Sequence, residues 1–229
     1  MSVEWVQIVH KERFGWRLGL HALALASSLA LAALERPELG LDAILFCALI
    51  GSVAAQARDE RGIWVILGII YIATPCLAFV WIREVRPFGM ESVVWLLAVV
   101  WTTDSVAYGV GSVLGGPKLA PSVSPKKTWA GAIAGVVCAA IVSILFTFVA
   151  GSGSAWVVLS AGVALSLLTQ MGDLAESALK RTFGVKDMSD LIPGHGGALD
   201  RLDGLLFATL GLAGAILVTG VTPLAWAPH

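Results

Sequence analysis

The stretch WAGAIAGVVCAAIVSILFTFVA, residues Trp129–Ala150, contains no Asp, Glu, Lys or Arg. A helix needs about 20 mainly apolar residues to cross the hydrocarbon core of a bilayer, and this stretch meets that requirement. The charge-free region is longer still, because no charged residue stands between Lys127 and Asp173. The sequence GSGS at Gly151–Ser154 interrupts it with a turn, so we expect two membrane-spanning helices rather than one.

The whole chain has the composition of a membrane protein. Hydrophobic residues make up 57% of its 229 residues, charged residues make up 14%, and the mean hydropathy is +0.84. Soluble domains usually contain about 45–50% apolar and about 25% charged residues. We therefore predict an all-α fold, a polytopic membrane helical bundle in a single integral membrane domain over 1–229. About seven segments can span: Trp16–Leu34, Leu39–Ala57, Ile63–Ile82, Ser92–Leu114, Trp129–Ala150, Ala155–Ala175 and Gly204–Trp226.

The basic residues predict an orientation. If the chain crosses the membrane seven times, twelve of the 15 Lys and Arg residues fall on one side, and only Arg36, Arg83 and Arg86 fall on the other. Cytoplasmic loops carry such an excess, so we expect the N-terminus inside and the C-terminus outside. A cleaved signal peptide is the alternative for the first segment, but its apolar run exceeds the usual length of about 7–15 residues. The net charge of −1 gives no indication of a nucleic-acid partner, and the three separated cysteines form no metal or redox motif.

An ionisable residue lies inside the fourth predicted span. Tyr108 and Gly111 follow Asp104 at i+4 and i+7, on the same helical face. A charged side chain is costly within a membrane, so it usually faces the bundle interior or a wet cavity and serves a function. We predict that Asp104 and Tyr108 contact a substrate. The alternative is a structural carboxylate bonded to a neighbouring helix.

The loop before Trp129 is rich in hydroxyl and basic side chains. Its last five residues, SPKKT, supply Ser124, Lys126, Lys127 and Thr128. Lysine is a compact charge suited to phosphate, and a helix N-terminus offers N–H donors to an anion. We therefore predict that this loop binds a phosphate-bearing substrate. The alternative is a positively charged loop in contact with lipid headgroups.

The densest group of charged residues lies between the sixth and seventh predicted spans. Asp173, Glu176, Ser177 and Lys180 fall at i, i+3, i+4 and i+7, on one helical face. Asp200 and Asp203 are three residues apart, so both carboxylates can approach one cation. Carboxylate oxygens commonly bind Mg²⁺ together with substrate phosphates. The alternative is a solvated, salt-bridged loop.

The run SALKRTFGVKDMSDLIPGHGGALDRLD, from Ser177 to Asp203, resembles the signature of the phosphatidate cytidylyltransferases, also called CDP-diacylglycerol synthases. The segments Trp101–Tyr108 and Ser124–Thr128 resemble that family's other two blocks, in the same order. The resemblance implies a multi-spanning, Mg²⁺-dependent enzyme that makes CDP-diacylglycerol and pyrophosphate from CTP and phosphatidic acid. Two positions depart from the family pattern. Ala130 stands where relatives often carry Glu or Gln, and Gly204 stands where Ser commonly follows the last aspartate.

The motifs and the resemblance together predict the site residues. The expected metal ligands are Asp173, Asp200 and Asp203, with Asp104 a weaker candidate. The expected catalytic residues are Asp173, Asp200 and Asp203 with Lys180, Arg181 and Arg201. The expected substrate-binding residues are Asp104, Tyr108, Ser124, Lys126, Lys127, Thr128, Ser177, Lys186, Asp187, His195, Gly196 and Gly197. In this interpretation residues 1–91 form N-terminal spans and residues 92–229 form the catalytic part.

The expected partners are CTP, phosphatidic acid and the lipid bilayer, with no nucleic acid, and a homodimer is left open. The expected location is the plasma (inner) membrane, with the active site facing the cytoplasm. A transporter would also place carboxylates within spans, but it would not require the long block rich in Lys, Arg, Asp and Gly. A CTP-dependent polyprenol or phytol kinase shares a related architecture and the same nucleotide, and the complete last block favours the cytidylyltransferase. The pattern of CDP-alcohol phosphotransferases is not met.

Overall fold

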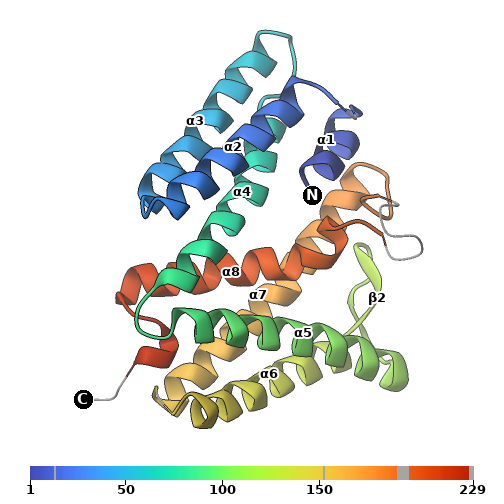
Figure 1. The fold of residues 1–229 in the computed structure, drawn as a ribbon. Coiled ribbons are helices and arrows are strands. Elements are labelled where there is room, and N and C mark those ends of the chain that lie inside the picture. Colours follow the sequence, from blue (N-terminus) through green and yellow to red (C-terminus); the bar gives the residue numbers. More distant parts are fainter. Residues whose placement is uncertain (13, 152, 190–195, 227–229) are drawn as a thin grey trace. The chain divides into compact units, whose positions relative to one another are not determined.

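The computed structural model describes residues 1–12, 14–151, 153–189 and 196–226. These residues form eight α-helices, a two-stranded hairpin and one 3-10 turn (Figure 1). The elements are α1 (Ser2–His10), α2 (Trp16–Ala33), α3 (Pro37–Gln56), α4 (Ile63–Glu84), α5 (Gly89–Leu114), β1 (Lys118–Ala120), β2 (Ser124–Thr128), α6 (Trp129–Ala150), α7 (Ala155–Thr182), α8 (Leu199–Thr219) and η1 (Pro223–Ala225).

Seven helices, α2 to α8, are long and apolar enough to cross a membrane. This confirms the predicted all-α fold with about seven spans, while the predicted direction of the chain across the membrane stays a prediction. Two helices are longer at their polar ends than expected. Helix α7 continues to Thr182, and α8 begins at Leu199, before the predicted start at Gly204. Many of the predicted site residues therefore lie on regular helix rather than in a long loop.

The chain divides into two compact units, and each is described by itself. The first unit comprises Met1–Trp81 and Phe183–Arg201, and the second comprises Ile82–Thr182 and Leu202–His229. The signature segment is thus shared between the units. The predicted single domain over 1–229 stays a prediction.

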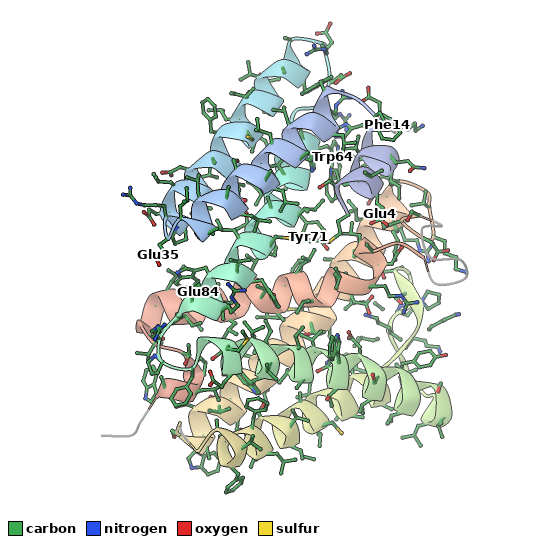
Figure 2. The ribbon with its side chains drawn as sticks, viewed as in Figure 1. Glu4, Phe14, Glu35, Trp64, Tyr71 and Glu84 are labelled. Carbon is green, nitrogen blue, oxygen red and sulfur yellow. The ribbon has the colours of Figure 1, made fainter. Side chains whose placement is uncertain are left out.

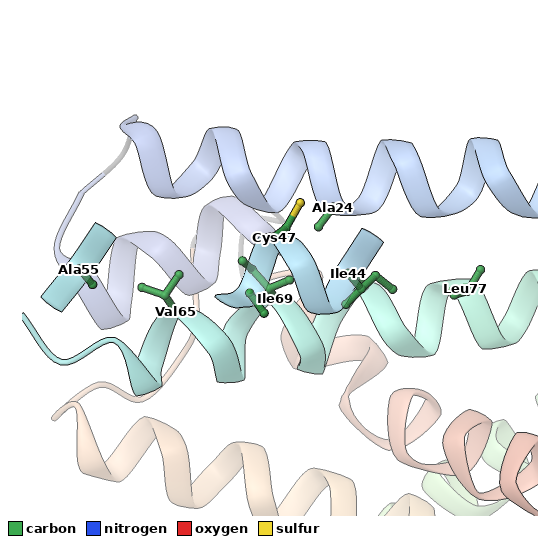
Figure 3. Close-up of a cluster of buried hydrophobic side chains, with 9 residues drawn as sticks. Ala24, Ile44, Cys47, Ala55, Val65, Ile69 and Leu77 are labelled. Atoms are coloured by element: carbon green, nitrogen blue, oxygen red, sulfur yellow. The ribbon is translucent and has the colours of Figure 1, made fainter. Parts of the chain in front are cut away.

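The first unit has its core where α2, α3 and α4 pack together. Ala24 on α2, Ile44 and Cys47 on α3, and Val65 on α4 are all buried in one hydrophobic cluster (Figure 3). Small residues let these helices approach closely, since a Cβ atom added to Gly51 would lie 2.6 Å from Val65 Cγ1. Close packing of this kind drives helix association in lipid, where the apolar surroundings offer no hydrophobic driving force.

The second unit is built on α5, α6 and α7, with part of α8. Gly135 on α6 packs against α5, since an added Cβ would lie 3.1 Å from Thr103 O. Two buried hydrogen bonds link the helices: Thr103 Oγ1 donates to Ser166 Oγ at 2.9 Å, and Trp95 Nε1 donates to Ser143 Oγ at 3.1 Å. Polar bonds between spans add to the packing of small residues.

The connection between α5 and α6 is an antiparallel hairpin rather than the irregular loop expected from its Gly, Pro and Ser content. Lys118 pairs with Thr128, and Ala120 pairs with Ser124. Thr128 then caps α6, because its Oγ1 accepts a hydrogen bond from Gly131 N at 3.2 Å. The hairpin gives the side chain of Lys127 a fixed place at the start of α6.

Candidate functional site

Three carboxylates gather in the second unit, and we call Asp104, Asp173 and Asp203 the acidic cluster. They come from α5, α7 and α8. Asp173 repels both Asp104 and Asp203 electrostatically, and Asp104 also repels Asp203. Lys127 of β2 attracts both of these carboxylates and forms an ion pair with Asp173. The cluster therefore concentrates negative charge beside one fixed cation.

Two glycines bring α7 and α8 close together at the acidic cluster. A Cβ atom added to Gly172 would lie 2.6 Å from Asp203 O, and one added to Gly204 would lie 2.7 Å from Thr169 Cγ2. Neither contact leaves room for a side chain. Because Asp173 follows Gly172 and Asp203 precedes Gly204, the close approach of the helices places the two carboxylates near each other. The departure from the family pattern at Gly204 thus has a steric reason in this chain.

The residues of the acidic cluster differ in exposure. Asp203 is only 8% exposed, and its Oδ1 accepts a hydrogen bond from Gly204 N at 2.7 Å. The side chain of Asp173 is 35% exposed, and its Oδ1 accepts a bond of 3.5 Å from Ser177 Oγ. Asp104 is exposed. The acidic cluster is thus accessible from the protein surface at Asp104 and buried at Asp203.

The donor chemistry of the acidic cluster fits a hard cation such as Mg²⁺. Mg²⁺ is usually bound by one or two carboxylates together with substrate phosphates, rather than by a closed cage of side chains. Among the residues that the structure describes, no group of three or more His, Cys, Asp or Glu side chains is arranged to hold an ion by itself. A cation at the acidic cluster would therefore need further ligands, which the phosphates of a substrate could supply.

Basic side chains of α7 are held by specific partners. Lys180 Nζ lies 2.6 Å from Glu176 Oε2, and Glu176 is buried at 1% exposure. Arg181 Nε donates to Val123 O, in the turn of the hairpin, at 3.3 Å. Glu176 was not among the predicted site residues, although its spacing of four from Lys180 was visible in the sequence. The first contact holds Lys180 along α7, and the second joins Arg181 to the hairpin.

The remaining predicted residues of the second unit lie around the hairpin and α5. Thr128 is buried, Ser124 is half-buried, and Lys126 is exposed. Tyr108 is 80% exposed. No interaction of Tyr108 with the acidic cluster is recorded in the described part of the chain, so its role in substrate binding stays a prediction.

The predicted residues of the first unit surround the start of α8. Asp200 Oδ2 accepts hydrogen bonds from Met188 N at 2.8 Å and from Gly197 N at 2.7 Å. Gly196 has a φ of +78°, which L side chains rarely adopt. Asp200 thus organises the backbone around it, and its predicted role as a metal ligand stays a prediction. Lys186, Asp187 and Arg201 are exposed, and His195 lies outside the described residues.

Sequence reasoning missed one residue of this region, Glu4 on α1 (Figure 2). Its carboxylate accepts hydrogen bonds from Ser189 Oγ, Ala198 N and Leu199 N. The same side of the first unit has an open cleft of about 960 Å³, lined by α1 residues and by residues 185–189. No sequence signal could connect Glu4 with partners 185 to 195 positions away.

Comparison with known proteins gives consistent matches. Residues 1–218 match the cytidylyltransferase family, so the match includes the N-terminal part in which the sequence alone showed no motif. The phosphatidate cytidylyltransferase of Brucella suis biovar 1 (strain 1330) is 44% identical over 179 residues, which cover 77% of this chain and 65% of that protein.

Two further relatives carry the same name. The phosphatidate cytidylyltransferase of Bacillus subtilis (strain 168) is 42% identical over 150 residues, 65% of this chain and 55% of that protein. That of Staphylococcus aureus (strain COL) is 42% identical over 132 residues, 57% of this chain and 51% of that protein. The matched part thus spans between about half and two thirds of these curated relatives. Since the family match covers nearly the whole sequence, the chain belongs to the cytidylyltransferase family.

Proposed function

We propose that this chain is a phosphatidate cytidylyltransferase, which transfers CMP from CTP to phosphatidic acid and releases pyrophosphate. The observation that carries the proposal is the acidic cluster with Lys127. Asp104, Lys127 and Asp203 lie in segments that resemble the blocks of this family. Membership in the cytidylyltransferase family and the names of the relatives support it. The seven apolar helices suit an enzyme whose lipid substrate stays in the membrane.

The chemistry needs charge neutralisation more than proton transfer. A phosphate monoester has its second pKa near ~6, so the phosphate of phosphatidic acid is mostly a dianion at neutral pH and needs no general base. One of its oxygens attacks the α-phosphorus of CTP. A bond forms between that oxygen and the α-phosphorus, and the bond from the α-phosphorus to the oxygen that bridges to the β-phosphorus breaks. The electron pair leaves with pyrophosphate, whose charge must be stabilised.

The residues of the chain divide this task. Asp173 and Asp203 would hold Mg²⁺ with Asp104 beside them, and Asp200 remains a predicted further ligand. When bound, Mg²⁺ supplies positive charge to the phosphate oxygens. Lysine and arginine side chains orient the two anionic substrates and offset their repulsion. These cations are Lys126, Lys127, Lys180, Arg181 and Arg201.

The proposal also includes the membrane in which the protein lies and the orientation of the chain across it. The excess of Lys and Arg in alternate loops favours a cytoplasmic N-terminus and an outer C-terminus. The hairpin and the start of α8 would then face the cytoplasm, where CTP is dissolved. In a bacterium, this membrane is the inner membrane. A homodimer stays a prediction, which light scattering in detergent tests.

The experiment is a reaction with purified protein, phosphatidic acid, Mg²⁺ and CTP labelled at either the α- or the γ-phosphate. We expect the α-label to appear in a CDP-lipid and the γ-label to appear in pyrophosphate. Chelation of Mg²⁺ should stop both. Transfer of the γ-label to a lipid would contradict the proposal and indicate a CTP-dependent lipid kinase. Uptake of a solute into proteoliposomes without CTP consumption would indicate a transporter.

A further inference from the structure

Glu4 is a buried carboxylate that binds the start of another helix. It is 3% exposed. Its Oε1 accepts hydrogen bonds from Ser189 Oγ at 2.7 Å and Ala198 N at 2.8 Å, and its Oε2 accepts one from Leu199 N at 2.9 Å. The first N–H groups of a helix have no partner within the helix, and negative charge is favourable there. Glu4 therefore caps α8 from a distant part of the sequence.

Glu4 and Asp200 bind neighbouring backbone groups. We call residues Gly196–Asp200 the α8 start. Gly197 N donates to Asp200 Oδ2, and the next two N–H groups donate to Glu4. A Cβ atom added to Gly197 would collide with Glu4 Oε1 and would lie 2.8 Å from Ser189 Oγ. The glycine of the signature is thus required by the position of Glu4, and the backbone that carries Asp200 is fixed by it.

Glu4 itself is held on a rigid support within the first unit. The neighbouring Trp5 is 3% exposed, and its Nε1 donates to Trp64 O on α4 at 3.2 Å. Its ring centroid lies 5.7 Å from that of Tyr71, also on α4. Gly68 leaves room for this ring, since an added Cβ would lie 2.5 Å from Trp5 Cδ1. Helix α1 is therefore anchored to α4 beside the carboxylate.

The charge on Glu4 is stabilised by its partners. Burial raises the pKa of Glu4, but the hydrogen bonds from Ser189, Leu199 and Ala198, together with the ammonium of Met1 at 3.1 Å from Oε2, hold the pKa below the ordinary value of 4.5. The side chain is consequently a carboxylate at neutral pH. Hydrogen bonds to an ionised acceptor are stronger than neutral ones, so this cap is a firm one.

We propose that Glu4 is a positioning residue for the cytidylyl transfer, acting through the α8 start and Asp200. The inference rests on the function proposed above. Glu4 does not touch the reacting atoms in this account. It fixes the backbone of the α8 start, from which Asp200 projects. The family match begins at residue 1 and therefore includes Glu4.

The test compares Glu4→Gln with the matched control Glu38→Gln, which alters an exposed carboxylate in the first turn of α3. In Glu4→Gln an amide replaces the charged acceptor. We expect amide hydrogen exchange at Ala198 and Leu199 to become about 10- to 100-fold faster. We also expect kcat to fall about tenfold and the half-saturating Mg²⁺ concentration to rise several-fold, because the ligands are less well placed. Glu38→Gln should match the wild type in every readout.

A second variant and the Mg²⁺ titration separate positioning from folding. Ser189→Ala keeps the charge of Glu4 and removes one bond to it, so it should change the same quantities in the same direction by a smaller factor. A merely structural role would lower the amount of active protein and leave the half-saturating Mg²⁺ concentration and the KM for CTP unchanged. That result, or unchanged exchange at Ala198 and Leu199, would overturn the proposal. If the wild type formed no CDP-lipid, the proposed function would fail, while exchange would still report whether Glu4 holds the α8 start.

Discussion

The carboxylates of the two units have different partners. In the first unit, Glu4 and Asp200 accept hydrogen bonds from backbone N–H groups of the α8 start and of Met188. In the second unit, the members of the acidic cluster repel one another and have Lys127 beside them. A carboxylate bound by peptide dipoles stabilises the fold, and adjacent carboxylates with little compensation are suited to attract a cation. The same residue type thus binds backbone in one unit and, under the proposed function, would bind a cation in the other.

The largest effect is expected from Asp203→Ala compared with Asp200→Ala. Loss of Asp203 should reduce CDP-lipid formation by at least about 10²-fold, since it removes stabilisation of the phosphate charge. The thermal unfolding midpoint should stay nearly constant, because a repulsive contact is removed as well. Asp200→Ala should lower the midpoint, because two backbone N–H groups lose their acceptor at a cost of about 1–3 kcal/mol. Equal loss of stability in both variants would contradict the distinction.

An intermediate effect is expected from Arg17→Met, which tests a structural charge of the first unit. The side chain of Arg17 is 4% exposed, pairs with Glu12 Oε2 at 2.8 Å and also pairs with Glu60. Removal leaves two carboxylates without their cation, but their side chains are 39% and 42% exposed and can be hydrated, so we expect a loss of about 1.5 kcal/mol in thermal or denaturant unfolding. Arg83→Met is the control, because Arg83 pairs with Glu84 on the surface and should contribute less than about 1 kcal/mol. Similar losses in both variants would show that burial does not decide the effect.

The smallest effect is expected from His10 on α1, which should make the stability of the fold depend on pH. Burial, and to a smaller degree repulsion by Arg17, lower the pKa of His10 from 6.5 to about 4, against the attraction of Glu12. The folded state therefore binds fewer protons than the unfolded state between these values, so stability is lost as the pH falls from 6.5 towards 4. His10→Gln cannot be protonated and should lose less stability between pH 7 and pH 5. Since the group is partly exposed, we expect a difference of no more than about 1 kcal/mol. Parallel pH profiles for the two proteins would contradict this assignment.

Much of the fold follows from residues near each other in the sequence. The charge-free run at Trp129–Ala150 gave one span directly, and the i, i+4, i+7 spacing of Asp173, Ser177 and Lys180 correctly indicated a helical face. Local patterns of apolar and polar residues decide such features, because each span must satisfy its own backbone in lipid.

The site was less accessible to sequence reasoning because it depends on contacts between distant segments. Asp104 was considered a weaker metal candidate than Asp200, yet the structure places Asp104 in the acidic cluster and bonds Asp200 to the backbone. The close approach at Gly172 and Gly204, which brings α7 against α8, has no local signal. The cap provided by Glu4 likewise joins two segments that are far apart in the sequence.

The account is tested most directly by divalent-cation binding at the acidic cluster. Mn²⁺ can stand in for Mg²⁺, and electron paramagnetic resonance measures its free concentration in the presence of CTP. We predict that the wild type binds Mn²⁺, that Asp173→Asn and Asp203→Asn bind it more than about tenfold more weakly, and that the α3 surface variant Asp42→Asn binds it as the wild type does. Unchanged Mn²⁺ affinity in Asp173→Asn and Asp203→Asn would contradict the account.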